Sequence, residues 1–234
     1  LPVLYDNSTT TQILMYYGNE NAIDKSNATA VFPGLRAYWA FEEGSGEIVK
    51  DSSGNGYDGE LANVTPGDLP NWRDQSYCKI GYCIESDDTD DGVNVSYLAI
   101  NGLDNVTFEA WIKTTDDRWG LISGANADQN NEYLIYMENI PELRLYIKGS
   151  YSGVSPGNLI DGNWHHLAVV RNSDGTAAIY VDGALLGTLS GLTTGILQID
   201  PNGLWLLQEQ DSVGDNWDAT QAFIGLIDDV RIFN

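Results

Sequence analysis

Basic residues are scarce in this chain of 234 residues. It has 11 Lys and Arg against 34 Asp and Glu, which gives a formal net charge of -23 at pH 7. This imbalance excludes nucleic-acid binding as a default function, because contacts to phosphate groups need Lys and Arg. The acidic excess favours a secreted protein, a cation-binding protein or a high-salt environment. Most of the acidic residues are scattered singly, which is typical of a solvated surface.

Long apolar runs and long helical patterns are also missing. No apolar run reaches the length of a membrane span, so we expect no transmembrane segment. There is no signal peptide and no initial Met, and we therefore expect a mature product or an excised fragment.

The chain has two adjacent histidines, His165 and His166, on a predicted strand, so that one faces inward and the other outward. A packed histidine is favoured there over a catalytic or metal-binding one.

Cysteine occurs twice, at Cys78 and Cys83, five positions apart. In an extracellular protein this spacing predicts a local disulfide that closes a small loop, and two free buried thiols are the alternative. No His or further Cys lies near them in sequence, which disfavours a metal site at the pair.

Short apolar or alternating runs, separated by Gly, Asn, Asp and Pro, make up most of the chain. This pattern predicts an all-β fold, a two-sheet antiparallel jelly-roll sandwich. The dipeptide Asp182-Gly183 lies between two such runs and is a strong hairpin signal. We predict strands at residues 35–42, 93–98, 106–114, 119–123, 132–137, 142–147, 164–171, 176–181, 184–189, 203–207 and 222–232.

The segment from residue 205 to residue 225 carries the best candidates for metal ligands. Its oxygen-bearing side chains are Glu209, Asp211, Asp218 and Gln221. Glu209 and Asp211 are two residues apart, so on an extended backbone both point to the same face and repel each other unless a cation lies between them. Cys and His are absent nearby, which argues against zinc, whereas an all-oxygen ligand set suits Ca²⁺.

The same segment resembles the calcium-loop signature of the pentraxins. The similarity lies in Gln-Glu-Gln-Asp-Ser-Val-Gly at 208–214, in Trp-Asp-Ala-Thr-Gln-Ala-Phe-Ile-Gly at 217–225, and in the closing Ile-Asp-Asp-Val-Arg-Ile-Phe. The resemblance implies that Glu209 and Asp211 bridge two calcium ions and that Gln210 gives its main-chain carbonyl. It also implies that Asp218 and Gln221 complete the second ion.

The pentraxin resemblance implies further ligands upstream. Residues 123–136 are similar to a family segment that carries an Asp-Asn pair, and here Asn130 and Asn131 occupy the place of the pair. Asn130 is a departure, because a neutral amide replaces a carboxylate; the first site is then weaker, or Asp128 has to help. Trp217 lies inside the polar loop and is a candidate for ligand contact, although core packing uses most aromatic residues in a sandwich.

Residues 35–234 resemble the wider laminin-G-like and concanavalin-like jelly-roll group. The similar segments follow one another in order at 37–46, 51–59, 108–112, 162–168 and 178–183 and in the terminal strand. Pentraxins usually carry a disulfide between the strands that match residues 108–112 and 166–170. Ala110 and Ala168 are expected to stand there and to fill the space as ordinary core, so that the fold is less tightly tethered.

Residues 1–34 are predicted to form an N-terminal β extension. They look like the closing strand and tail of a β domain found beside laminin-G-like modules in large prokaryotic surface proteins. Residues 10–17 would be an apolar strand with no sheet of its own, which is an association hazard. The strand either folds back along the jelly roll or pairs with a neighbouring subunit as an added strand.

Two further patterns bear on surface and partners. Five N-glycosylation sequons indicate a glycosylated surface protein, and they begin at Asn7, Asn27, Asn63, Asn94 and Asn105. The acidic segment 87–92 could hold a cation, but it lacks the downstream Glu of a helix-loop-helix calcium site, and a solvated turn is favoured.

These patterns predict a calcium-binding recognition or adhesion domain, extracellular or at the cell surface, that binds carbohydrate or phosphorylated ligands through loop-bound Ca²⁺. The alternative is a structural subunit of a surface fibre or matrix that meets neighbouring subunits through its N-terminal strand, with calcium only stabilising; a homo-oligomer stays open. Some concanavalin-like sandwiches are β-glucanases with a Glu-x-Asp-x-x-Glu strand. Here Gly214 stands where the second Glu would be needed, and we expect no enzyme.

Overall fold

Alternating burial along the central strands sorts the side chains into a core face and an outer face. The computed structural model of the protein describes residues 32–64, 67–139 and 141–234. Within them, β7 (Val106–Lys113) and β12 (His165–Arg171) alternate strictly between buried and half-buried residues. This period of two is what a strand shows when one of its faces packs against a second sheet.

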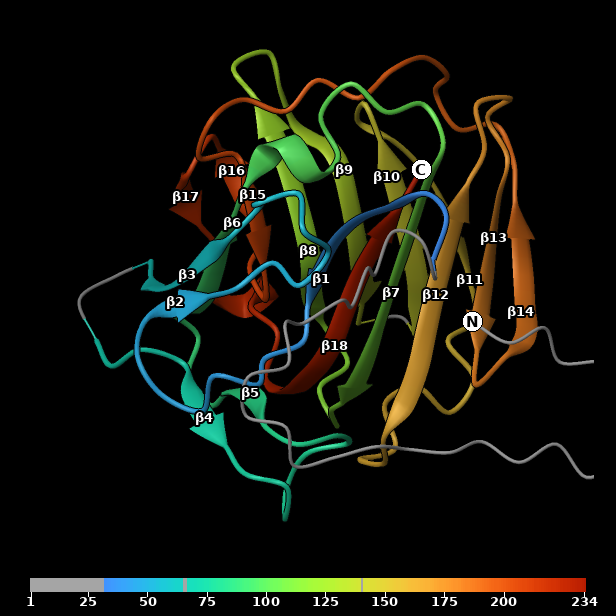
Figure 1. Cartoon of the computed structure of the whole chain (residues 1–234). Helices are drawn as coiled ribbons and strands as arrows, with labels where there is room; N and C mark the ends of the chain where they lie inside the picture. Colours follow the sequence, from blue (N-terminus) through green and yellow to red (C-terminus); the bar gives the residue numbers. More distant parts are fainter. Residues whose placement is uncertain (1–31, 65–66, 140) are drawn as a thin grey trace, which may run out of the picture.

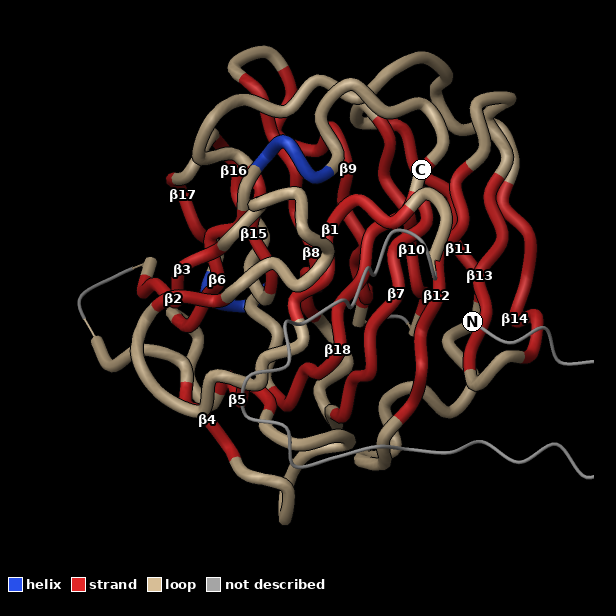
Figure 2. The backbone as a smooth tube through the Cα atoms, in the orientation of Figure 1, coloured by secondary structure: helices blue, strands red, loops and turns tan. Residues whose placement is uncertain are grey.

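The described strands form two antiparallel sheets packed face to face, with a small hairpin at one side (Figures 1 and 2). Sheet A has the order β14-β13-β12-β7-β18-β5-β4, and β1 also pairs with β18. Besides β7 and β12, its strands are β1 (Leu35–Trp39), β4 (Asn71–Arg73), β5 (Cys83–Ser86), β13 (Ala177–Val181), β14 (Ala184–Leu189) and β18 (Gly225–Phe233).

Sheet B has the order β11-β10-β9-β8-β15-β6-β3-β2. Its strands are β2 (Ile48–Val49), β3 (Gly59–Asn63), β6 (Asp91–Val95), β8 (Trp119–Asn126), β9 (Gln129–Glu138), β10 (Glu142–Ile147), β11 (Ser150–Val154) and β15 (Leu204–Leu206). The hairpin consists of β16 (Gln210–Ser212) and β17 (Asp215–Trp217), and two 3-10 turns, η1 (Tyr97–Ala99) and η2 (Ala219–Gln221), complete the elements.

One apolar core fills the space between the sheets. Its largest members have essentially no exposed surface and come from both layers: Trp39, Phe41, Phe108, Trp119, Tyr133 and Phe223. Burying a side chain of this kind stabilises the fold by roughly 1.5–3 kcal/mol relative to leaving it in water. The core therefore holds the two sheets as a rigid support for the loops at their edges.

The predicted all-β, two-sheet antiparallel sandwich is confirmed. The predicted hairpin at Asp182-Gly183 joins β13 and β14, and its two residues have φ of 52° and 77°, the left-handed region that this turn needs. The strand predicted at 93–98 ends at Val95 and turns into η1, and the last strand begins at Gly225 rather than at residue 222. The short strands β2, β3, β4, β5, β11, β16 and β17 were not predicted.

The interpretation of Ala110 and Ala168 as a pair filling the place of a disulfide is wrong. In the β7–β12 ladder Ala110 lies opposite Leu167, whereas Ala168 lies opposite Glu109. Ala110 is fully buried and Ala168 is half-buried. Since neighbouring residues of a strand point to opposite faces, the two alanines do not face each other. Leu167 fills the space beside Ala110 instead.

The predicted disulfide between Cys78 and Cys83 is present, with its Cα atoms 5.4 Å apart. The loop that it closes lies over the C-terminal strand β18. There the buried carboxylate of Asp228 accepts hydrogen bonds from the backbone N–H groups of Lys79 (3.1 Å) and Ile80 (2.8 Å). The covalent link thus holds two donors against a buried acid of sheet A.

Candidate functional site

The candidate metal loop leaves sheet B at Leu207, which has the left-handed φ of 69°. A positive φ is uncommon for a residue with a branched side chain and turns the chain sharply out of the strand. Beyond this turn, Gln208 and Gln210 are fully buried and point into the fold. Gln208 Nε2 donates to the carbonyls of Thr89 and Asp91, and Gln210 Nε2 donates to those of Ser123 and Gly203. These hydrogen bonds fix the backbone on either side of Glu209.

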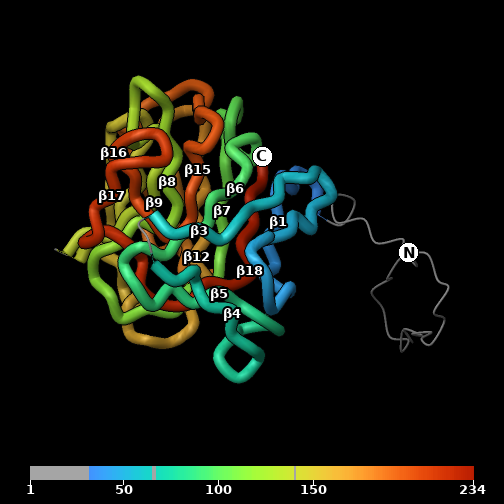
Figure 3. The backbone as a smooth tube through the Cα atoms, turned by 90° about the vertical axis from the view of Figure 1, so that its left-hand side faces the viewer, coloured from blue at the N-terminus to red at the C-terminus, as the bar shows by residue number. Residues whose placement is uncertain are grey.

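Glu209 and Asp211 alternate with the two inward glutamines and lie on the other face of the loop. Glu209 is only 2% exposed, because it packs against β8. The close approach depends on Gly120, where an added Cβ would lie 2.8 Å from the Cβ of Glu209. The hairpin β16–β17 itself lies beside β8 and β9 (Figure 3). The sequence pattern thus correctly places both carboxylates on one side of the extended segment.

Glu209 and Asp211 open into one pocket of about 220 Å³ on the outer face of sheet B. The opposite wall comes from β9 and β10. Asn131 and Gln221 from the set of predicted ligands line the same pocket, together with Arg118, Leu134, Tyr136, Glu138 and Tyr146. Four of the seven predicted metal-site residues therefore meet at one place, although they come from segments almost eighty residues apart in sequence.

Asn130 lies at the border of this pocket. Its Nδ2 donates to Asp211 Oδ1 at 3.0 Å, so its amide binds the carboxylate of Asp211. On the far side of Asp211 a wider groove of about 750 Å³ runs between the loops at 126–130 and 200–201. Asp128 lines this groove and not the smaller pocket. Gln210 is buried, and its side chain turns away from the pocket to the hydrogen bonds described above.

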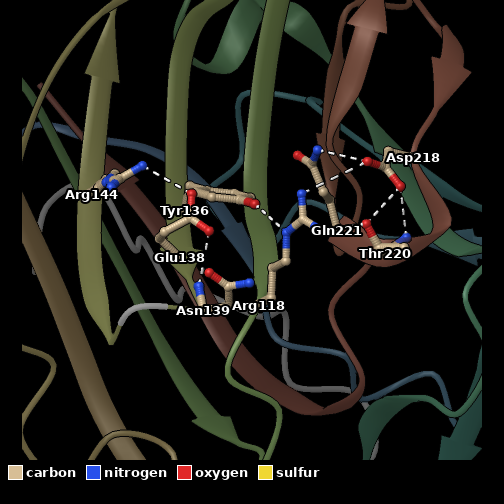
Figure 4. Close-up of polar contacts among 8 residues, drawn as sticks. All are labelled: Arg118, Tyr136, Glu138, Asn139, Arg144, Asp218, Thr220 and Gln221. Carbon is tan, nitrogen blue, oxygen red and sulfur yellow. Dashed lines mark hydrogen bonds and ion pairs between the residues drawn. The ribbon is translucent and has the colours of Figure 1, made fainter.

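Asp218 and Trp217 belong to the far end of the loop. Asp218 begins η2, and its Oδ1 accepts hydrogen bonds from the backbone N–H (2.9 Å) and the hydroxyl (2.8 Å) of Thr220. Its Oδ2 accepts one from Gln221 Nε2 at 2.9 Å (Figure 4). Trp217 packs edge-on against Trp205, with ring centroids 4.8 Å apart. A contact of Trp217 with a ligand stays a prediction.

The electrostatics of the pocket are dominated by Glu209. Burial, together with the negative charges of Asp211 and Asp218, raises the pKa of its carboxyl to about 7. Oε2 of Glu209 and Oδ1 of Asn131 are both buried without a hydrogen-bond partner among the described residues. A buried oxygen without a donor costs about 1–3 kcal/mol, more when it is charged. The residues therefore fit a hard cation bound by oxygen atoms.

The oxygen atoms of this site are not all carboxylate. In the described part of the chain no three or more His, Cys, Asp and Glu side chains gather closely enough to hold a metal ion. The set available at the pocket is instead a mixture of carboxylates and amides, contributed by Glu209, Asp211, Asn131 and Gln221. Such a mixture is within what Ca²⁺ accepts, since carbonyl and amide oxygens are common among its ligands.

The other candidates have local structural roles. In the acidic segment 87–92, Asp91 is buried and its Oδ2 accepts hydrogen bonds from the N–H groups of Asp87 and Asp88, which closes a turn. His165 faces inward and bonds through its two ring nitrogens to Asp182 (2.7 Å) and Asp161 (3.1 Å). These two partners were not predicted, because Asp161 lies on a loop and Asp182 in a hairpin turn.

Comparison with known proteins gives the family. Residues 87–234 match the family model described as the concanavalin A-like lectin/glucanases superfamily. The chain belongs to this superfamily. Human pentraxin-4 is 31% identical over 151 residues, which are 60% of this chain and 31% of pentraxin-4. The chain thus spans about a third of the length of this relative.

Two solved structures have a fold similar to that of this chain. The native heptameric SAP-like pentraxin from Limulus polyphemus has 23% identity and a TM-score of 0.50, over 57% of this chain and 65% of its own. Domain 4 of an extracellular arabinanase from Geobacillus stearothermophilus, in complex with arabinotriose, has 20% identity and a TM-score of 0.60, over 86% and 92%. At sequence identities of 23% and 20%, the similarity to these two structures concerns the fold alone.

Several predictions fall partly or wholly outside the described residues. The N-terminal extension, its strand at 10–17 and the sequons at Asn7 and Asn27 belong to residues 1–31 and stay predictions. Asn63 and Asn94 lie on β3 and β6, and Asn105 is exposed before β7. Their glycosylation also stays a prediction. Across residues 32–64, 67–139 and 141–234, no helix is long and apolar enough to cross a membrane.

Sequence reasoning missed Arg118, just before β8, and the residues of β9 and β10 that complete the pocket. Arg118 precedes β8, Tyr136 lies on β9 and Tyr146 on β10. A signal was available for Tyr136, which follows Asn130 by six residues on one strand and so lies on the same face. For Arg118 and Tyr146 there was none, since only the pairing of three strands brings them to Glu209 and Asp211.

Proposed function

We propose that this domain is an extracellular recognition domain that binds Ca²⁺ in the pocket at Glu209 and uses it to hold a carbohydrate or phosphorylated ligand. The proposal is carried by two buried oxygens, Glu209 Oε2 and Asn131 Oδ1, that have no hydrogen-bond partner in the part of the chain that the structure describes. Their residues line a pocket together with Asp211 and Gln221. Buried oxygen atoms without a partner lower the stability of the folded protein unless a cation binds them.

Glu209, Asp211 and Asn131 would hold the ion, with the amide of Gln221 beside them. Gln208 and Gln210 keep the loop in position from below, and Gly120 leaves room for Glu209. A bound Ca²⁺ would neutralise the carboxylates and offer open coordination positions to oxygens of a ligand. Binding of the ion would also reduce the repulsion between Glu209 and Asp211.

The outer face of sheet B supports a sugar or another ring-shaped ligand next to the pocket. Tyr136, Tyr146 and Tyr151 come from β9, β10 and β11, and their rings touch in series, with centroids 6.3 Å and 4.9 Å apart. Tyr151 is half exposed. Aromatic rings offer apolar faces and a hydroxyl. The arabinotriose complex of the related arabinanase domain is in keeping with a carbohydrate ligand.

The site favours binding over catalysis. A glycosidase needs a pair of carboxyl groups that flank the scissile bond, one of them as acid. In this chain Glu209 and Asp211 are followed by Ser212, Val213 and Gly214 rather than by a second Glu.

The disulfide at Cys78 and Cys83 and the sequons support an extracellular location. Adhesion and assembly with neighbouring subunits extend the same proposal.

The test is binding of the chain to immobilised neutral glycans and to phosphocholine, with calcium and with a chelator. We expect calcium-dependent binding to one of the two classes, and loss of that binding in Glu209→Gln. The matched control is Asp215→Asn, which removes one charge from an exposed position of the same hairpin. Binding that persists in the chelator, or that Glu209→Gln leaves intact, would contradict the proposal.

The structural-subunit alternative has its own test. It places assembly in the N-terminal strand and gives calcium a stabilising role only. Deletion of residues 1–30 would then dissociate an assembly of the full chain while leaving the monomer folded, as measured by light scattering and circular dichroism. An unchanged oligomeric state after the deletion would refute this alternative.

A further inference from the structure

Arg118 is the one cationic side chain in the lining of the candidate calcium pocket, as far as the described residues extend, and it is held in place from two sides (Figure 4). Its Nε donates to the hydroxyl of Tyr136 on β9 at 2.9 Å, and its Nη1 donates to Thr220 Oγ1 at 2.7 Å. Its Nη2 forms an ion pair with Asp218 Oδ2 at 3.9 Å. The guanidinium thus joins the sheet to the far end of the 208–221 loop.

The acid at this end of the loop already has its partners. Both oxygens of Asp218 accept hydrogen bonds, Oδ1 from Thr220 and Oδ2 from Gln221 Nε2, in addition to the charge of Arg118. Gln221 turns the nitrogen of its amide, not the oxygen, toward Asp218. A second cation bound by Asp218 and Gln221 would have to displace these contacts and lie beside a fixed positive charge.

The other end of the pocket is different. Glu209 Oε2 and Asn131 Oδ1 are buried without partners among the described residues, and Asp211 lies next to them. Arg118 offsets one negative charge at the Asp218 end, whereas no cationic side chain of the described lining is paired with Glu209 or Asp211. Glu138, which also lines the pocket, shares Arg144 with Glu142, at 3.0 Å and 2.6 Å.

We propose that this pocket binds one divalent cation, at Glu209, Asp211 and Asn131, and that the guanidinium of Arg118 takes the place of a second ion beside Asp218. The inference rests on the proposed function and narrows it. It departs from the two ions that the pentraxin resemblance implies. Arg118 is in this view a specificity-determining residue, because its fixed charge sets how many ions the loop accepts.

Ion counting on the full chain separates this inference from the proposed function. The chelator-treated protein is dialysed to equilibrium against calcium, and bound calcium is measured by atomic emission. One ion per chain is the expected result. Two ions per chain would overturn the inference and leave the proposed function standing. No bound calcium at millimolar concentration would refute both.

Variants of Arg118 test the cause of the count. Arg118→Gln removes the charge, and we expect a second ion to bind between Asp218 and Gln221. Arg118→Lys keeps a positive charge and should keep the count at one. Arg144→Gln is the matched control, because it removes an arginine from the same face that pairs with Glu138 and Glu142 rather than with Asp218. A count of one in Arg118→Gln would contradict the inference.

Asp218→Asn provides a second test if Arg118→Gln fails to fold. The inference makes Asp218 a partner of Arg118 and not a ligand of the ion, so this change should leave one ion bound, with an affinity within about tenfold of the unaltered protein. Circular dichroism and thermal melting establish that each variant is folded. Loss of all calcium binding in Asp218→Asn would overturn the inference.

Discussion

Two buried acids in the two sheets of this sandwich contrast a carboxylate held by backbone donors with the one that we propose to bind a cation. Asp228 in sheet A is 0% exposed and Glu209 beside sheet B is 2% exposed, and burial is the largest cause that raises the pKa of each to about 7. Each has one oxygen without a hydrogen-bond partner within the described residues. By burial and pKa alone the two carboxyls would be indistinguishable.

Their surroundings differ. Asp228 receives two backbone N–H groups from the disulfide loop, at Lys79 and Ile80, which cover it. Glu209 faces the acids Asp211 and Asp218 and opens into a pocket that Asn131 also lines. Backbone donors stabilise the charged form of a buried acid, whereas a buried acid that opens into a pocket beside other acids can gain the same stabilisation from a cation. This difference is the reason for proposing a structural role for Asp228 and cation binding for Glu209.

The largest expected effect is the pH dependence that Asp228 confers. The pKa of its carboxyl is 3.8 in ordinary surroundings and about 7 in the fold, so between these values the folded state keeps a proton that the unfolded state has released. Its contribution to stability is thus complete below about pH 4 and is lost as the pH rises to 7. Asp228→Asn should remove this decline, which is roughly 4 kcal/mol at ~1.4 kcal/mol per unit of pKa.

Urea unfolding of the calcium-free protein at a series of pH values measures this effect. The comparison is between the unaltered chain and Asp228→Asn, since Asn keeps an oxygen that accepts from Lys79 and Ile80. The charges of Asp229 and Glu42 also raise the pKa of Asp228. The control is Asp68→Asn, which removes one negative charge at an exposed position. Parallel curves for the chain and Asp228→Asn would contradict the assignment.

The second effect in size concerns the disulfide. Replacement of Cys78 and Cys83 by Ser opens the loop that covers Asp228 and should lower the free energy of unfolding by about 2 kcal/mol, as expected for a short closed loop. The calcium affinity should not change, because the loop lies over sheet A and the pocket lies on sheet B. Urea unfolding and calcium titration by calorimetry test the two parts; a weakened calcium affinity would show that the regions are coupled.

The smallest effect is expected at Gly120. An added methyl group would lie 2.8 Å from the Cβ of Glu209, so Gly120→Ala must push this side chain out of place. We expect calcium affinity to fall about tenfold, equivalent to ~1.4 kcal/mol. The matched control is Gly124→Ala on the same strand, where the methyl group meets the tip of Ile199 instead. Equal calcium affinities in the two variants would refute the role of Gly120.

Much of the fold could be predicted because it depends on local patterns. Alternation at 106–113 and 165–171 and the Asp182-Gly183 turn are visible without knowledge of the rest of the chain. The missed strands are short, and pairing with a neighbour rather than their own sequence defines them. The prediction that Ala110 and Ala168 face each other failed for a related reason. The strands pair one residue out of the expected register, which places Ala168 on the opposite face from Ala110.

Part of the candidate site could be predicted from the sequence, as far as which predicted ligands line one pocket, but the contacts around them could not; that these residues bind a metal stays a prediction. The spacing of Glu209 and Asp211 and the resemblance at Asn131 and Gln221 named the four side chains that the pocket unites. Asp128 belongs to a neighbouring groove. Arg118 could not be foreseen, because its bonds to Tyr136 and Thr220 depend on how β8, β9 and η2 meet in three dimensions.

Calcium-dependent thermal melting of three proteins tests the central distinction most directly. The unaltered chain and Asp228→Asn should both melt at a higher temperature when calcium is added, by an amount equivalent to about 2.7 kcal/mol at a hundredfold excess over the dissociation constant. Glu209→Gln should show no such shift. A calcium shift that survives in Glu209→Gln and disappears in Asp228→Asn would place the cation in sheet A and contradict the account.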